Sequence, residues 1–272
     1  MKKFYKIGVI GTGNMGEALI RGLLRSQLVK PYEVIASDTN REKLASHRRK
    51  YRIHTTSSNE KILKGAQTII LAVKPQNMDE VLTEIRKDLK KSHLIVSIAA
   101  GIDTKTLKRG LGNHSALVRV MPNLPALIDA GMTGIFCGRG VLSKQKRFAH
   151  QIFEAVGKTV AVPNEKWMDA ITGLSGTGPA YVFALIEALM KAGKKIGLPQ
   201  AMVKKLTLET VLGAALMVIQ TGLDPEELRS RVTSKKGTTW AATKVLKKFR
   251  FWDMMVKAIE AATKRAGELR KI

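Results

Sequence analysis

Short apolar runs alternate with stretches of helical periodicity over the first 160 or so residues of the chain. Five of these runs are rich in β-branched residues and nearly free of polar positions, which is typical of strands buried on both faces of a parallel sheet. They lie at Lys6–Ile10, Glu33–Ala36, Thr68–Val73, Leu94–Ile98 and Ala116–Val120. Two late edge strands are expected at Gly131–Phe136 and Thr159–Val162, with a helix over residues 143–156 between them. The pattern predicts an α/β domain.

The pattern changes after Pro163, where only helical periods remain. Helices are expected at Tyr181–Ala192, Pro199–Gln220, Thr238–Lys248 and Phe251–Leu269, with a short one that begins at Asp224 and Pro225. Gly193 and Gly222 are expected to end the helices before them. The chain is therefore predicted to divide into an α/β domain at residues 1–163 and an all-α domain at residues 164–272.

One segment of the helical half, Val211–Ile219, is apolar almost all round. A helix of this kind is buried on most of its faces. A small helical domain offers little cover of its own, so a partner subunit is the expected source. The segment favours a homo-oligomer.

Composition agrees with a folded protein, since 44% of the 272 residues are hydrophobic. The single cysteine, Cys137, excludes an internal disulfide framework and favours a reducing cytoplasm. Apolar runs stay shorter than the ~18 residues that a membrane span needs, so no membrane partner is expected.

Charge is the unusual feature, because 47 Lys and Arg against 22 Asp and Glu give a net charge of +25. Nucleic acid is a possible partner for such a chain. The basic residues are, however, spread along the sequence, and aromatic residues make up only 5%, too few for a base-stacking platform. The charge therefore favours attraction of anionic cofactors and substrates over nucleic-acid binding.

A glycine-rich turn directly follows the first predicted strand and opens a helix. Its residues are Gly11, Thr12, Gly13, Asn14, Met15 and Gly16. One glycine allows the tight turn, one lets the backbone approach a pyrophosphate, and one lets helix and strand pack closely. The helix N-terminus offers free N–H groups to the phosphates. The turn predicts a dinucleotide cofactor, NADPH or NADH.

Asp38 ends the second predicted strand, 22 residues after Gly16. An acid there hydrogen-bonds the adenosine ribose and repels a 2′-phosphate, which favours NADH. Arg41 follows closely and is suited to contact such a phosphate. The alternative is that Asp38 caps a helix beginning near Asn40.

Three further strand ends are expected at the same edge of the sheet, where ligands of parallel sheets bind. The candidate cofactor contacts at these ends are Val73, Lys74, Pro75, Ala99, Ala100 and Gly101. Met121-Pro122-Asn123 ends the next strand. In the helical half, Gly173–Tyr181 is read either as a helix-breaking linker or as a close approach of backbone to a ligand or a partner helix. Residues 232–241 are read either as a helix cap or as a carboxylate site.

These segments together resemble the pyrroline-5-carboxylate reductase family over essentially the whole chain. The residues that carry the resemblance are Ile10–Gly16, Ala72–Pro75, Ser97–Gly101, Met121–Asn123, Gly131–Thr133, Gly173–Val182 and Ser234–Ala241. The resemblance implies a Rossmann-type domain, then an all-α dimerisation domain. It also implies NAD(P)H-dependent reduction of 1-pyrroline-5-carboxylate to L-proline by a homodimer or larger homo-oligomer.

By position in the resemblance, Ser234, Thr238 and Thr239 look like the residues that hold the substrate carboxylate and ring nitrogen, and Glu165 like a further substrate contact. The family loop usually reads Ser-Pro-Gly-Gly-Thr-Thr, whereas Lys235 and Lys236 replace the proline and the first glycine here. No metal site is expected, and the five histidines are interpreted as surface or structural residues.

Three other readings are compatible with parts of the pattern. A β-hydroxyacid dehydrogenase has the same architecture and uses a lysine on the long helix after the domain junction, but Lys191, Lys194 and Lys195 lie late in or beyond the helix predicted here. A basic nucleic-acid-binding protein would keep the fold without turnover. A dinucleotide-sensing subunit would bind the cofactor without hydride transfer.

Overall fold

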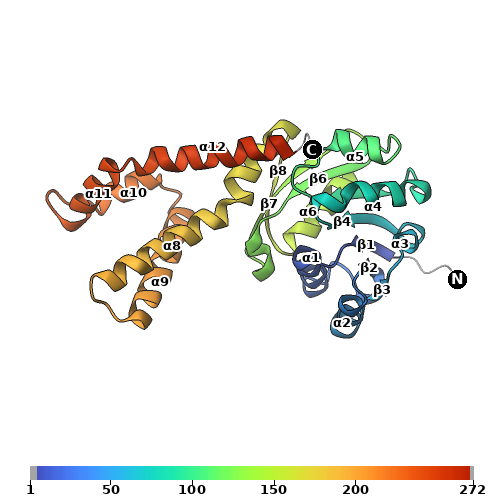
Figure 1. Cartoon of the computed structure of the whole chain (residues 1–272), viewed down its shortest axis with the longest axis horizontal. Helices are drawn as coiled ribbons and strands as arrows, with labels where there is room; N and C mark the ends of the chain where they lie inside the picture. The colour runs from blue at the N-terminus through green and yellow to red at the C-terminus, as the bar shows by residue number, and fades with distance from the viewer. Residues whose placement is uncertain (1–4, 270–272) are drawn as a thin grey trace. The chain divides into compact units, whose positions relative to one another are not determined.

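The computed structural model describes residues 5–269 (Figure 1). The described residues form two compact units. One contains the chain up to Thr177 together with the residues from Glu260 onward, and the other is Gly178–Ile259. The domain boundary expected from the sequence, with residues 1–163 in one domain and 164–272 in the other, remains a prediction.

The first unit is built on one eight-stranded sheet in the order β3-β2-β1-β4-β5-β6-β7-β8. The strands are β1 (Tyr5–Ile10), β2 (Val34–Ser37), β3 (His54–Thr56), β4 (Ala66–Leu71), β5 (Leu94–Ser97), β6 (Leu117–Met121), β7 (Gly131–Cys137) and β8 (Gly157–Ala161). All neighbouring pairs are parallel except β6 and β7. The α/β class predicted from the apolar runs is confirmed.

Two details of the sheet differ from the prediction. The run expected as an edge strand at Gly131–Phe136 is the interior strand β7, hydrogen-bonded to β6 on one side and β8 on the other. The edge beyond β2 is formed by β3, which the sequence pattern missed. This strand has only three residues, all half-buried, so it carries no apolar run to reveal it.

Helices cover both faces of the sheet, as buried parallel strands require. They are α1 (Asn14–Arg25), α2 (Arg41–Tyr51), α3 (Asn59–Gly65), α4 (Met78–Ile85), α5 (Thr104–Gly110) and α6 (Ser143–Glu154). Side chains of α1 and α6 pack with Ile70 in one core. Those of α3, α4 and α5 pack with Ile69 and Leu71 in the other. Because successive side chains of β4 point to opposite faces of the sheet, this strand contributes to both cores.

The chain leaves the sheet through a helical junction. A 3₁₀ turn at Glu165–Trp167 leads into α7 (Met168–Ile171) and a π-helical turn at Thr172–Gly176. The segment Gly173–Tyr181 thus contains the π-helical turn and a bend at Thr177, which separate α7 from α8 (Gly178–Lys195). Gly176 lets this turn lie close to the end of β6, because a Cβ there would meet the side chain of Met121 at 2.5 Å. Asn123 completes the contact by donating a hydrogen bond to the carbonyl of Ser175, 3.1 Å away.

The second unit is entirely helical. It contains α8 (Gly178–Lys195), α9 (Gln200–Thr221), α10 (Pro225–Arg231), α11 (Thr238–Lys248) and the start of α12 (Phe251–Leu269), whose last turns belong to the first unit. Gly222 ends α9 with a left-handed φ of +66°, as predicted. Gly193 does not end α8, which continues to Lys195.

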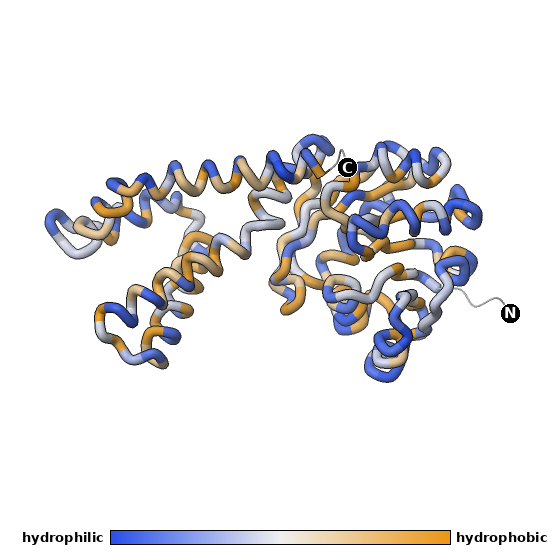
Figure 2. Tube along the Cα trace, viewed as in Figure 1, coloured by the Kyte–Doolittle hydropathy of each residue, from blue (hydrophilic) through white to orange (hydrophobic). Residues whose placement is uncertain are grey.

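Large apolar side chains on α8 and α9 are exposed in the single chain, and Figure 2 shows the corresponding hydrophobic positions along both helices. Phe183 is 53%, Leu212 55% and Ile219 75% exposed. Exposed apolar faces of this kind mark association surfaces. Among residues 5–269 no single helix is long and apolar enough to cross a membrane, and only the pair α9 and α10, bent by 115°, passes that test jointly.

Candidate functional site

The turn after β1 has the geometry that a dinucleotide phosphate requires. Gly11 has φ +97°, and a Cβ there would lie 2.7 Å from the carbonyl oxygen of Ala72. A Cβ on Gly16 would overlap the carbonyl oxygen of Gly11. Around Gly13, in contrast, no described atom lies within 4 Å of an added Cβ. Two glycines are thus needed by the fold, whereas the third leaves open space where the backbone can approach a ligand.

Helix α1 begins directly at this open space, with Gly13 as its N-cap. The first hydrogen bond of the helix joins the N–H of Glu17 to the carbonyl of Gly13 at 2.8 Å. The preceding N–H groups, those of Asn14, Met15 and Gly16, have no partner within a helix of this geometry. Together with the helix dipole they suit a phosphate. The turn therefore fits a dinucleotide.

A cleft of about 340 Å³ extends from the turn along the carboxyl ends of the strands. Five of the predicted cofactor contacts line it, namely Gly11, Gly13, Asp38, Val73 and Lys74. Its lining also includes Lys43, Ser57 and Asn59, which the sequence analysis did not select. Ser57 follows the missed strand β3 directly. An assignment of β3 from sequence would have placed Ser57 at the ligand-binding edge.

Asp38 connects the glycine turn with the loop that follows β2. Its Oδ2 accepts hydrogen bonds from the N–H and the hydroxyl of Thr12, both at 2.8 Å, and its Oδ1 accepts one from the N–H of Asn40 at 2.9 Å. Burial acts to raise the pKa of the carboxyl, but these bonds outweigh it and hold the pKa below its ordinary value. The cap of α2 is Asn40, whose side chain accepts from the N–H of Lys43. Asp38 is therefore ionised at neutral pH and is not the helix cap.

The loop after β5 carries the predicted contacts Ala99, Ala100 and Gly101. The hydroxyl of Ser97 accepts a hydrogen bond from the N–H of Ala99 at 3.3 Å. Gly101 has φ +77°, and a Cβ there would lie 2.8 Å from the Cβ of Leu269 at the end of α12. The loop is thus closely packed on the C-terminal helix, and only glycine fits at its tip.

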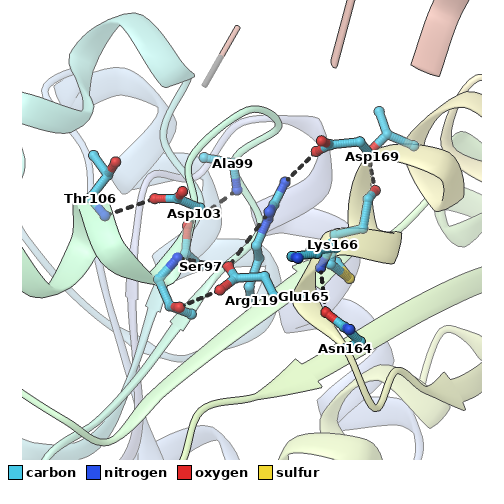
Figure 3. A network of polar contacts seen from close by, with 12 residues as sticks. Ser97, Ala99, Asp103, Thr106, Arg119, Asn164, Glu165, Lys166 and Asp169 are labelled. Carbon is cyan, nitrogen blue, oxygen red and sulfur yellow. Dashed lines mark hydrogen bonds and ion pairs between the residues drawn. The ribbon is translucent and has the colours of Figure 1, made fainter. Parts of the chain in front are cut away.

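Glu165 lies beside this loop, in a network of buried charges (Figure 3). Its carboxylate accepts the N–H of Thr104 at 2.7 Å and the hydroxyl of the same residue. Arg119, which is 2% exposed, extends its guanidinium to Glu165 and to Asp169, at 3.5 and 3.3 Å. The sequence pattern does not predict Arg119, Asp169 or Thr104 as site residues.

The predicted substrate residues Ser234, Thr238 and Thr239 lie together at the start of α11, in the second unit. Gly237 is the N-cap, and its N–H donates to the carbonyl of Ser234 at 3.0 Å. A Cβ on Gly237 would overlap the hydroxyl of Ser234, so this hydroxyl lies directly over the helix N-terminus. Lys236 has φ +60°, in the left-handed region that favours glycine. Hydroxyls and unpaired N–H groups at one helix start suit a carboxylate.

Residues 5–269 contain no group of three or more His, Cys, Asp or Glu side chains placed to hold a metal ion. His93 and His114 precede β5 and β6, so they lie at the amino ends of parallel strands, opposite the cleft.

A mostly parallel sheet with a glycine turn and a cleft at its carboxyl edge is typical of the cofactor domain of NAD(P)-dependent oxidoreductases, and comparison with known proteins places the chain in that class. A family model described as NADP oxidoreductase, coenzyme F420-dependent, matches residues 6–101. A second model, described as pyrroline-5-carboxylate reductase dimerisation, matches residues 165–269. The chain belongs to the pyrroline-5-carboxylate reductase family.

Similarity to members of this family extends over the whole chain. The pyrroline-5-carboxylate reductase of Pseudomonas aeruginosa is 41% identical, with 97% of this chain and 96% of the relative covered. The solved structure of the Coxiella burnetii reductase is 37% identical with a TM-score of 0.92, covering 99% and 100% of the two chains. That of the Plasmodium falciparum reductase, with NADP bound, is 30% identical with a TM-score of 0.89, covering 99% and 100%. The prephenate dehydrogenase of Aquifex aeolicus, at 17% identity, shares the fold alone.

Proposed function

We propose that this chain reduces 1-pyrroline-5-carboxylate to L-proline with a reduced nicotinamide dinucleotide. The observation that carries the proposal is the agreement between full-length similarity to reductases of that name and a glycine turn with space for a pyrophosphate at Gly13. The dimerisation match and the exposed apolar faces of α8 and α9 support a homo-oligomer.

The chemistry divides between cofactor, substrate and protein. The bound dinucleotide supplies the hydride. The cyclic imine, protonated on nitrogen, brings its own electrophilic carbon, so the protein has to bind and orient rather than activate. Gly11–Gly16 and the start of α1 would hold the pyrophosphate, and Asp38 the adenosine ribose. Ala99, Ala100 and Gly101 would hold the nicotinamide ribose.

The start of α11 would hold the substrate. Ser234 and Thr238 would bind its carboxylate through hydroxyl and N–H donors, and Thr239 would form the hydrogen bond to the ring nitrogen. Lys235 and Lys236, both exposed, add positive charge that attracts an anionic substrate. The resemblance also implies a substrate contact for Glu165, whose carboxylate oxygens both accept hydrogen bonds from Thr104.

The test of this proposal is the loss of nicotinamide absorbance when the purified protein meets 1-pyrroline-5-carboxylate, with NADH and NADPH compared in parallel. Turnover that yields proline is the expected result. Cofactor binding without turnover would overturn the proposal and point to another imine, an oxo acid or a sensing role.

Replacement of Thr239 by alanine is expected to lower kcat roughly tenfold, because a hydrogen bond to the reacting ring would be lost. The KM for the cofactor should stay unchanged. Thr239→Ser keeps the hydroxyl and should retain most of the turnover. Thr243→Ala, which removes a hydroxyl one turn further along α11, is the matched control. Wild-type steady-state kinetics in Thr239→Ala would remove Thr239 from this role.

Replacement of Asp38 by serine is expected to shift the ratio of kcat/KM values from NADH toward NADPH. The cause is removal of an ionised carboxylate that repels a 2′-phosphate. Asn40→Ala, which removes the cap of α2 and keeps Asp38, is the control and should leave the ratio unchanged. If Asn40→Ala shifted the ratio equally, the effect would belong to α2 and not to the carboxylate.

A further inference from the structure

Arg119 is a buried cation whose hydrogen-bonding capacity is not used up. It lies on β6 in register with Ser97 of β5, and its side chain is 3% exposed. Glu165 and Asp169 both form ion pairs with it, yet its Nη1 group makes no hydrogen bond to any of the described residues. A buried guanidinium is costly unless carboxylates are held beside it. Arg119 therefore fixes Glu165 and Asp169 at this place in the fold (Figure 3).

Glu165, held by Arg119, in turn restrains the start of α5. The N–H of Thr104 belongs to the first turn of α5, where N–H groups have no partner within the helix. Glu165 accepts that N–H at 2.7 Å and the hydroxyl of Thr104 as well, from 61 positions further along the chain. Both oxygens of the carboxylate are thus engaged by Thr104, and one of them also faces Arg119.

The segment between Ser97 and Thr104 is restrained at both ends by this network. Ser97 pairs with Arg119 across the sheet, and Thr104 is held by Glu165. Between them lies the turn of Ala99, Ala100 and Gly101, with Gly101 packed against Leu269. A shift of Glu165 would therefore displace the turn that is assigned to the nicotinamide ribose.

We propose that Glu165 and Arg119 are positioning residues for the nicotinamide end of the cofactor, acting through Thr104, and that Glu165 does not touch the imine. This inference rests on the proposed function, because it takes Ala99–Gly101 as a cofactor contact. Glu165 sets the position of that loop, and the ion pair with Arg119 holds the Glu165 carboxylate in place.

The decisive variant is Thr104→Val, which removes one hydroxyl bond to Glu165 and keeps the size of the side chain. Because one such hydrogen bond is lost, the Kd for NADPH is expected to rise roughly fivefold. Glu165→Gln, which keeps the shape but loses the charge, should raise it at least as much. Both variants should lower kcat, because the hydride donor is displaced, and both should leave the KM for the imine unchanged. The Kd is measured by nicotinamide fluorescence without imine.

Thr83→Val and Glu60→Gln are the matched controls, since both side chains are exposed and lie on α4 and α3. In both control variants the Kd for NADPH, kcat and the KM for the imine should equal the wild-type values. A neutral Thr104→Val combined with a Glu165→Gln that raises only the KM for the imine would overturn the inference and make Glu165 a substrate contact. If the wild-type protein reduced no pyrroline carboxylate, the proposed function would fail, yet the Kd comparison would still decide whether the network positions the cofactor.

Discussion

Replacement of Gly13 by alanine is expected to weaken NADPH binding roughly a hundredfold, or about 3 kcal/mol, without unfolding the protein. The backbone of Gly13, at φ −66° and ψ −176°, is open to any residue. The space around its missing Cβ is empty of described atoms within 4 Å. A methyl group there would meet the pyrophosphate and not the protein. Fluorescence titration with NADPH, alongside thermal unfolding of the free protein, measures both effects.

Gly16→Ala is the matched variant, because it adds the same methyl group three residues away with the opposite expected outcome. Its Cβ would overlap the carbonyl oxygen of Gly11, so helix and strand would have to move apart. Overpacking of this kind costs about 1–3 kcal/mol of unfolding free energy. A Gly13→Ala variant that bound NADPH normally, or that melted as early as Gly16→Ala, would contradict the division of roles between the two glycines.

The apolar pattern was sufficient to predict most of the sheet, and the failures have physical causes. The pattern predicts β7 as an edge strand because the pairing of β7 with β8 depends on tertiary contacts that periodicity does not encode. Gly193 looked like a helix end, but its missing side chain lets Val203 of α9 approach to 2.9 Å from where a Cβ would be. Glycine inside a helix here serves packing between helices and not termination.

The candidate site likewise has parts that the sequence predicts and parts that it does not. The glycine turn and Asp38 are local features, so their spacing was enough to place them at one cleft. The network around Arg119 joins residues 50 and 61 positions apart, and no spacing rule reaches that far. The signal present in the sequence was an arginine inside an otherwise apolar strand, Leu117–Met121, since a buried arginine requires carboxylate partners. The roles of Ser234, Thr238 and Thr239 remain predictions that kinetics must test.

Two buried histidines make the stability of the first unit dependent on pH. His93 is 3% exposed and His114 8%. The N–H of Lys90 donates to Nδ1 of His93 at 3.0 Å, and Nε2 of His114 lies 2.8 Å from the carbonyl of His93. Burial, with smaller contributions from the charges of Lys90 and His114, lowers the pKa of His93 to about 4. Burial also lowers the pKa of His114. Both rings are held neutral by the fold.

The free energy of unfolding is therefore expected to fall as the pH is lowered from 7.5 to 5. Below its ordinary pKa of 6.5, His93 takes up a proton in the unfolded chain but not in the folded one until pH 4, so acid favours unfolding. At about 1.4 kcal/mol per pKa unit, His93 alone accounts for about 2 kcal/mol by pH 5 and about 3 kcal/mol in all. Urea unfolding at intervals of half a pH unit measures the slope above the range where most carboxylates titrate. His93→Gln should flatten that slope, and His114→Gln should flatten it in part. A slope unchanged in His93→Gln would show that the acid sensitivity arises elsewhere in the chain.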